Sequence, residues 1–247
     1  MSIQPTRRRI QSLLVAGAVV AGAWAVLWWP VRTQQGVNYL VSQHTVPLHL
    51  KLIRFVSRDL EYRYLVHHLT EGIRGDESKV LRLYEWVRTH IHRGVPKGMP
   101  VVDDHVWHII VRGYGTSDQL ADVLATLCAY ANVPADLAML APAGHSPIYA
   151  ITMVKIDGRW SPLDPYYGVI VRNSDQRLSS REEILAHPEL VRRVAPDVKI
   201  NGIAYSRLYE WLPEISSNGD LRPYRHMPLR RAWYELKHRV HAFLRIL

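Results

Sequence analysis

The sequence predicts an α+β domain that follows a single N-terminal membrane helix. Three observations predict it: an uncharged apolar run near the N-terminus, two later segments with helical spacing of apolar residues, and two short apolar runs joined by a tight turn. The chain has 247 residues, of which 48% are hydrophobic and 21% charged. That length suits one well-buried domain plus an anchor and is too short for two large domains.

The N-terminal apolar run is the predicted anchor. Residues 10–29 contain no charged side chain, and about twenty helical residues at ~1.5 Å each cross the roughly 30 Å of bilayer hydrocarbon. Arg7, Arg8 and Arg9 precede the run, and the first charge after it is Arg32. The basic cluster stays in the cytoplasm by the positive-inside rule, so we expect a single-pass protein of the cytoplasmic (inner) membrane with its domain facing the periplasm or exterior.

A cleaved signal peptide is the alternative for this segment. Ala23-Trp24-Ala25 offers the small residues that a signal peptidase requires. The apolar run continues past that site, which favours an anchor. Thr6-Arg7-Arg8-Arg9-Ile10 also has a weak similarity to a twin-arginine export signal.

Charge and cysteine content restrict the partners. The net charge of +9 favours anionic surfaces such as lipid headgroups or acidic glycans. Because the domain is expected outside the cytoplasm, we predict no nucleic-acid partner. Cys128 is the only cysteine, so the chain forms no internal disulfide and its fold depends on its core.

The next elements are a lead-in and a helix. Residues 31–47 are predicted to be a stalk. Residues 48–72 combine an alternating start with later helical spacing, and we expect a helix in their second part. Residues 78–91 place apolar side chains on one helical face and end before Gly94 and Pro96, which predicts a helix.

A second helix and a hairpin are predicted after the segment Gly113-Tyr114-Gly115-Thr116-Ser117. Residues 120–131 carry the apolar stripe of the helix, Ser117 lies at or near its N-cap, and Asn132-Val133-Pro134 ends it. The runs at 149–156 and 159–163 are joined by Asp157-Gly158, a strong signal for a hairpin.

The C-terminal region carries no chemical motif. It predicts one helix around residues 181–194 and a basic amphipathic helix at 229–247. The apolar stripe of the second helix can pack on the protein's own core, which we expect, or lie on anionic lipid. The helix is also a candidate surface for a protein partner. Its apolar stripe is Leu229, Trp233, Leu236, Val240, Phe243 and Leu247.

The order of these motifs over residues 78–168 resembles the transglutaminase-like superfamily. The shared features are a helix, Gly115-x-Ser117 opening a second helix, the Asn132-Val133-Pro134-Ala135 exit, and a hairpin with Asp157-Gly158-Arg159-Trp160 and Leu163-Asp164-Pro165. The resemblance implies a papain-like α+β fold, with helices packed on a small antiparallel sheet. It implies nothing about residues 170–247.

The resemblance also implies three catalytic positions, which in that family hold Cys, His and Asp. Carried over residue by residue, they are Ser117, Tyr149 and Asp164. A serine hydroxyl stays protonated and needs a base, and a phenol with a reference pKa of ~10 is a poor one at neutral pH. With Asp157-Gly158 as a two-residue turn, Tyr149 and Asp164 become diagonal neighbours on one face of the hairpin.

Substitutes for the lost groups are distant. Cys128 lies about 16 Å from Ser117 along one helix. His145 could reach Ser117 only if its loop folds back. Each triad position also has an ordinary structural interpretation: Ser117 as an N-cap, Tyr149 as a strand aromatic and Asp164 as a turn residue before proline.

The best metal-like cluster contains Asp103, Asp104, His105 and His108. Its two histidines are three residues apart, as a helix requires to direct both at one ion, but no fourth ligand is evident. We therefore predict no metal and no cofactor.

The resulting hypothesis is a catalytically inactive, membrane-anchored bacterial protein that binds an envelope peptide or glycan, or a partner subunit of an envelope polysaccharide system. The predicted ligand groove is Tyr114, Ser117, Asp118, Tyr149 and Tyr166. One alternative is an active hydrolase or acyltransferase using Ser117 with Asp164 and a histidine such as His145. Another is a structural membrane subunit whose groove is filled. The predicted segments are a cytoplasmic N-terminus (1–9), the anchor (10–30), a stalk and lead-in helix (31–72), the transglutaminase-like core (73–170) and a C-terminal extension (171–247).

Overall fold

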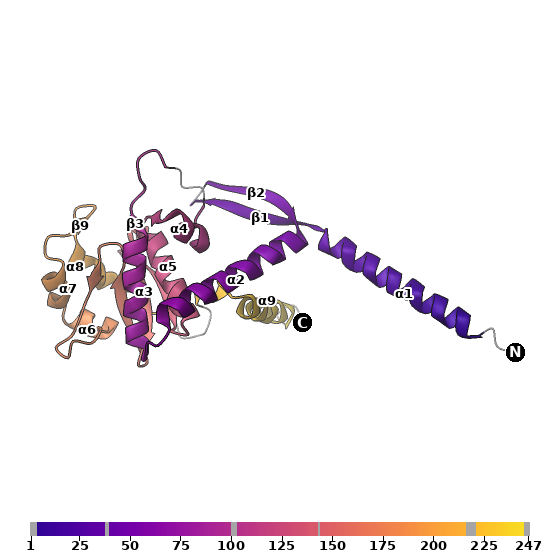
Figure 1. Cartoon of the computed structure of the whole chain (residues 1–247). Helices are drawn as coiled ribbons and strands as arrows, with labels where there is room; N and C mark the ends of the chain where they lie inside the picture. The colour runs from indigo at the N-terminus through magenta and orange to yellow at the C-terminus, as the bar shows by residue number, and fades with distance from the viewer. Residues whose placement is uncertain (1–3, 38–39, 100–102, 143, 216–220, 245–247) are drawn as a thin grey trace. The chain divides into compact units, whose positions relative to one another are not determined.

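The computed structural model describes residues 4–37, 40–99, 103–142, 144–215 and 221–244 (Figure 1). The chain divides into two compact units, Met1–Ser57 and Arg58–Leu247. Helix α2 (Leu48–Thr70) contributes to both. The predicted end of the chain at residues 245–247, including Leu247, lies outside the described residues.

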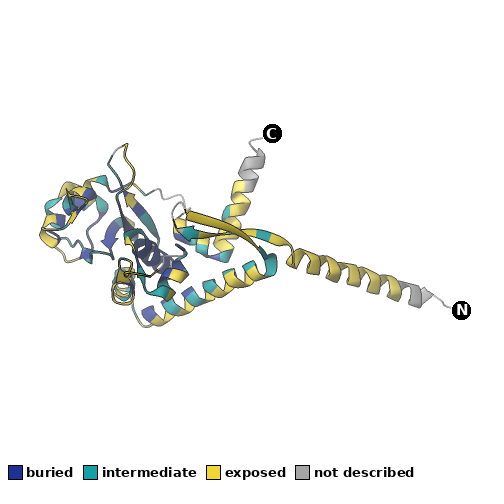
Figure 2. Ribbon diagram, turned by 90° about the horizontal axis from the view of Figure 1, so that it is seen from above, coloured by how far each residue is buried: buried dark blue, intermediate teal, exposed yellow. Residues whose placement is uncertain are grey.

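The first unit contains the predicted anchor. Helix α1 (Gln4–Leu27) includes a candidate membrane span, Arg9–Leu27, with a mean hydropathy of 2.0 and no residue buried within the protein (Figure 2). Such a helix is compatible with a membrane anchor or a signal sequence. Where the sequence predicts a stalk, strands β1 (Pro30–Val37) and β2 (Leu40–Pro47) form an antiparallel hairpin. Helix α2 begins at Leu48, so the alternating start of this segment is not a strand.

The second unit holds a four-stranded antiparallel sheet in the order β5-β6-β7-β8. The predicted hairpin is confirmed, because Ile156 pairs with Arg159 across the turn. The two turn residues, Asp157 and Gly158, have φ of 50° and 80°. A two-residue turn needs positive φ at both positions to match the right-handed twist of the strands. The predicted helices at 78–91 and after Gly115 are also confirmed. The elements of the second unit that follow α2 are α3 (Asp76–His90), β3 (His92–Arg93), α4 (Val106–Arg112), β4 (Tyr114–Gly115), α5 (Ser117–Tyr130), β5 (Ala135–Leu140), β6 (Tyr149–Ile156), β7 (Arg159–Asp164), β8 (Val169–Ile170), α6 (Arg181–Ala186), α7 (Glu189–Val194), β9 (Lys199–Ile200), β10 (Ile203–Ala204), α8 (Tyr205–Leu208), η1 (Tyr209–Trp211), η2 (Arg222–His226) and α9 (Pro228–Leu244).

Both faces of the sheet are covered. On one face α5 packs against β5 and β6, and α3 and α4 pack on α5. We call this layer the first core. The opposite face, which includes Tyr149, Ile151 and Met153 of β6, packs against the short helices α6–α8. We call that layer the second core. Its side opposite the sheet is formed by the C-terminal region.

Two predictions for the C-terminal region are wrong. The single helix at 181–194 is two helices, α6 and α7, because Pro188 has no backbone N–H to continue α6. The apolar stripe of α9 does not pack on the core at its described positions: Leu229, Trp233 and Leu236 are 84%, 68% and 54% exposed. The side chains of Val240 and Phe243 lie outside the described residues.

Candidate functional site

The Asp164 carboxylate is the centre of a buried hydrogen-bond cluster. Asp164 ends β7 and is 0% exposed. Its Oδ2 accepts hydrogen bonds from Tyr149 Oη at 2.7 Å and from Tyr205 Oη, and its Oδ1 accepts from the backbone N–H groups of Tyr166 at 2.8 Å and Tyr167 at 3.0 Å. All four partners donate, which suits an ionised carboxylate. Tyr149 and Asp164 are therefore neighbours, as the hairpin register predicts.

The C-terminal region extends this cluster. Tyr205 and Tyr209 lie one turn apart in α8 and η1, and their hydroxyl oxygens are 3.0 Å apart. Because Tyr205 donates to Asp164, Tyr209 donates to Tyr205. From the first core, Tyr84 Oη donates to the backbone oxygen of Asp164 at 3.0 Å. In the sequence, only the i, i+4 spacing of Tyr205 and Tyr209 indicates that these two tyrosines lie side by side. We call Asp164, Tyr149, Tyr205 and Tyr209 the tyrosine–carboxylate cluster.

Burial determines the protonation of this cluster. Burial, with the adjacent Asp164 charge, raises the pKa of Tyr149 far above its ordinary value. Burial likewise raises the pKa values of Tyr205 and Tyr209. Burial raises the pKa of Asp164, and the hydrogen bonds from Tyr205 and Tyr149 act in the opposite direction. The tyrosines remain protonated donors at neutral pH, so Tyr149 cannot serve there as a general base.

Ser117 is the first residue of α5, and the N-cap is Thr116 rather than Ser117. The Thr116 N–H donates to Gln119 Oε1 at 3.1 Å. A Cβ at Gly115 would come within 2.9 Å of that same oxygen, which explains the glycine before the helix. Ser117 is half-buried. Among the described residues, no hydrogen bond joins it to a histidine, to Tyr149 or to Asp164.

Neither of the two candidate substitutes that the sequence offers, His145 and Cys128, forms a hydrogen bond with Ser117 among the described residues. His145 is exposed in the loop between β5 and β6, where its N–H donates to the backbone oxygen of Pro142 at 3.0 Å. Cys128 is fully buried inside α5, and burial raises the pKa of its thiol. A buried, protonated thiol has little nucleophilic character.

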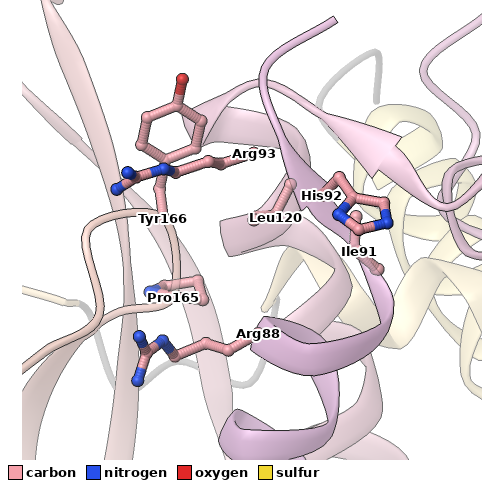
Figure 3. Close-up of a pocket in the computed structure, with 7 residues that line it drawn as sticks. All are labelled: Arg88, Ile91, His92, Arg93, Leu120, Pro165 and Tyr166. Atoms are coloured by element: carbon pink, nitrogen blue, oxygen red, sulfur yellow. The ribbon is translucent and has the colours of Figure 1, made fainter. Parts of the chain in front are cut away.

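An open pocket of about 300 Å³ is lined in part by the residues that directly follow Asp164 of the tyrosine–carboxylate cluster. Figure 3 shows the side chains that line it. Pro165 and Tyr166 come directly after Asp164, and Leu120 lies one helical turn after Ser117. We call it the basic pocket. Its lining residues are Arg88, Ile91, His92, Arg93, Leu120, Pro165 and Tyr166.

Strand β3 brings the basic residues to this position. His92 and Arg93 pair in parallel with Tyr114 and Gly115 of β4, immediately before α5. Of the predicted groove residues, Tyr166 lines the pocket and Tyr149 is buried in the cluster.

The remaining predicted groove residues, apart from Ser117, are Tyr114 and Asp118, and each contacts a residue close to it in the sequence. The guanidinium of Arg112 lies 5.5 Å from the centre of the Tyr114 ring. Asp118 Oδ1 accepts a hydrogen bond from Thr116 Oγ1 at 2.5 Å.

The acidic and histidine cluster before α4 has a structural role. Asp103 accepts from the His105 N–H at 2.9 Å and contacts His108 Nδ1 at 2.5 Å, and His105 Nδ1 caps α4 by accepting from the Trp107 N–H at 3.2 Å. Asp104 accepts from Gln119. Burial lowers the pKa of His105 to about 3. Within the described parts of the chain, no group of three His, Cys, Asp or Glu side chains could hold a metal ion.

Comparisons with known proteins agree with the sequence motifs. Residues 63–165 match the model of the transglutaminase-like superfamily. No curated protein matches the chain.

Solved structures that are similar to the chain include a candidate protease from Parabacteroides distasonis (13% identity, TM-score 0.37, 55% of this chain and 35% of that one). A candidate cysteine protease from Cytophaga hutchinsonii has 18% identity and a TM-score of 0.38, over 52% of this chain and 45% of that one. A TGase has 14% identity and a TM-score of 0.35, over 60% and 46%.

The chain thus spans less than half the length of these three proteins. The family assignment depends on the sequence match and on the motifs. Residues 63–165 of this chain form a transglutaminase-like domain, with helices packed on a small antiparallel sheet in the papain-like manner.

Proposed function

We propose that this protein is a membrane-anchored, non-catalytic transglutaminase-like protein that binds a component of the cell envelope. The observation that carries the proposal is the occupation of Asp164. Each of its two carboxylate oxygens already accepts two hydrogen bonds, and the residue is 0% exposed. A carboxylate that must orient a catalytic imidazole needs a free acceptor position, and this one has a tyrosine in the place of that imidazole.

The basic pocket supports binding over a purely structural role. A subunit with a filled groove would have no cavity beside the positions that correspond to the family's active site. Here the tyrosine–carboxylate cluster is closed, whereas about 300 Å³ next to it stays open. The proposed ligands are an envelope peptide or glycan, or a partner subunit of an envelope polysaccharide system.

The proposed location is the inner membrane, with the domain in the periplasm or outside the cell. The apolar span of helix α1 and the basic Arg7, Arg8 and Arg9 at its N-terminal end support this orientation. The net charge of +9 and the exposed apolar stripe of α9 suit a protein that works close to anionic surfaces or a protein partner.

An activity assay tests the non-catalytic proposal against the alternative of a Ser117 hydrolase or acyltransferase. The full-length protein in a neutral detergent would be incubated with amide and ester substrates. We expect the same background turnover for wild type, Ser117→Ala and the control Ser78→Ala, which removes an exposed serine from the first turn of α3. Turnover that is lost in Ser117→Ala and kept in Ser78→Ala would refute the proposal and would favour His145, or another histidine, as the base.

A further inference from the structure

The basic pocket contains two arginine guanidinium groups that form no ion pair with a carboxylate in the described parts of the chain. Arg88, His92 and Arg93 all line it. In Figure 3 the two guanidinium groups lie on one side of the pocket with Pro165 between them. Among the described residues, no carboxylate lies within 4.0 Å of either guanidinium, although seven other arginines do form such ion pairs. Both arginines are exposed and therefore accessible to a ligand.

The fold holds Arg88 in this position. Its guanidinium lies 5.7 Å from the centre of the Tyr84 ring, which fixes one side. On the other side, a Cβ at Gly168 would overlap the guanidinium, so the absence of a side chain there leaves room for it. A guanidinium that is held in place loses less conformational entropy when it binds an oxyanion in a bidentate manner.

The charge pattern selects the class of ligand. The two guanidinium groups attract a carboxylate or phosphate and repel an ammonium group. A free amino acid would need a nearby carboxylate for its ammonium, and the described residues that line the pocket include none. The preferred ligand therefore carries an oxyanion and no positive charge.

The size and polarity of the pocket select the rest of the ligand. About 300 Å³ is at the lower end for small-molecule pockets, which suits one ring-sized group with its anion. Four of the seven lining side chains, Arg88, His92, Arg93 and Tyr166, are polar. A polar, hydroxylated ring suits such a lining better than an aromatic one.

We propose that the basic pocket binds a sugar unit that carries a carboxylate or a phosphate. The inference deepens the proposed function, on which it rests, by naming an acidic saccharide as the envelope component. The carboxylated and phosphorylated forms share the oxyanion that the arginines recognise, and separate probes distinguish them.

Calorimetric titration of the full-length protein in neutral detergent at low salt tests the proposal. The probes are D-glucuronate, D-glucose 1-phosphate, D-glucose, inorganic phosphate and L-glutamate. We expect at least one acidic sugar to bind about 10-fold or more tightly than the other three probes. We expect Arg88→Gln and Arg93→Gln each to weaken that binding about 10-fold or more, since each removes charge-assisted hydrogen bonds. Arg82→Gln, on an exposed arginine of α3 that does not line the pocket, is the matched control.

Three results would overturn the inference: neither acidic sugar binds, glucose or glutamate binds equally well, or the pocket variants bind like Arg82→Gln. Equal binding of inorganic phosphate would also count against a sugar ligand. Product analysis of each titrated sample separates this inference from the proposed function. A hydrolysed probe would contradict the non-catalytic proposal even if the arginine variants weaken binding as expected, whereas absent binding without hydrolysis contradicts only the saccharide.

Discussion

The tyrosine–carboxylate cluster and the basic pocket are adjacent, because the peptide bond from Asp164 to Pro165 joins them. The cluster is buried, whereas the pocket is open. Asp164 is 0% exposed and accepts four hydrogen bonds from residues of three separate segments. Pro165 and Tyr166, which follow it, line an open pocket whose arginines have no acidic partner among the described residues. A buried carboxylate that accepts all its hydrogen bonds stabilises the fold, whereas an exposed guanidinium without an acidic partner is available to a ligand.

The largest effect on stability is expected when the buried carboxylate is removed. In Asp164→Ala, two buried tyrosine hydroxyls and two backbone N–H groups lose their acceptor. We expect the free energy of unfolding to fall by about 3–5 kcal/mol, as when one partner of a buried polar network is removed.

Urea unfolding of the full-length protein in detergent, followed by tryptophan fluorescence, measures this change. The control is Arg93→Gln in the basic pocket, for which we expect a change within about 0.5 kcal/mol, since the side chain is exposed. A loss below about 1 kcal/mol for Asp164→Ala would mean that the carboxylate does not anchor the second core.

A smaller effect is expected from Tyr149→Phe, which removes one donor to Asp164. The lost hydrogen bond to a charged group should reduce the free energy of unfolding by about 1–3 kcal/mol at pH 7. Burial raises the pKa of Tyr149 in the folded protein. Its stabilising contribution is therefore fully present below the unfolded pKa of ~10 and is lost as the pH rises further.

The difference between wild type and Tyr149→Phe should accordingly shrink above pH 10, by up to about 1.4 kcal/mol per pH unit. Urea unfolding at a series of pH values from 7 to 11 measures it. Tyr166→Phe in the basic pocket is the control, with little effect at pH 7. A difference that stays constant up to pH 11 would contradict the burial of Tyr149.

The smallest stability effect is expected from Gly168→Ala, which sharpens the description of the pocket. Gly168 has a φ of +75°, so alanine there adopts a strained backbone, at about 1 kcal/mol. Gly72→Ala is the matched control, because Gly72 has a φ of +74° and open space around its Cβ position. Only the change at Gly168 should also displace Arg88 and weaken binding of the acidic sugar. Equal binding by both variants would show that Gly168 does not position Arg88.

Local patterns in the sequence predicted the hairpin and most helices. The Asp157-Gly158 turn fixes the register of β6 and β7, and with it the approach of Tyr149 to Asp164. Apolar periodicity identified α3 because one face of that helix lies in the first core. Helix α5 also carries an apolar stripe, although all of its residues from Gln119 to Tyr130 are buried. The end of α6 before Pro188 was not predicted, although the sequence contains the information, since proline ends a helix for a local steric reason.

The remaining features depend on contacts between distant segments. Tyr205 lies 41 residues from Asp164 in the sequence, and neither residue carries a local signal for the other. The basic pocket likewise combines α3, β3, α5 and the segment after β7, so its charges converge only in the folded chain. The exposed stripe of α9 was mistaken for a core face because an amphipathic pattern does not reveal what covers it.

The origin of Tyr205 and Tyr209 affects how the domain can be dissected. A fragment that stops at residue 170, shortly after the family match ends at residue 165, would keep the Asp164 carboxylate and lose two members of its cluster. Water would then reach the β6 face that holds Tyr149, Ile151 and Met153. The smallest piece of this protein that folds independently should therefore extend beyond η1, and a protease that nicks the chain between β8 and α8 should leave two fragments that stay associated.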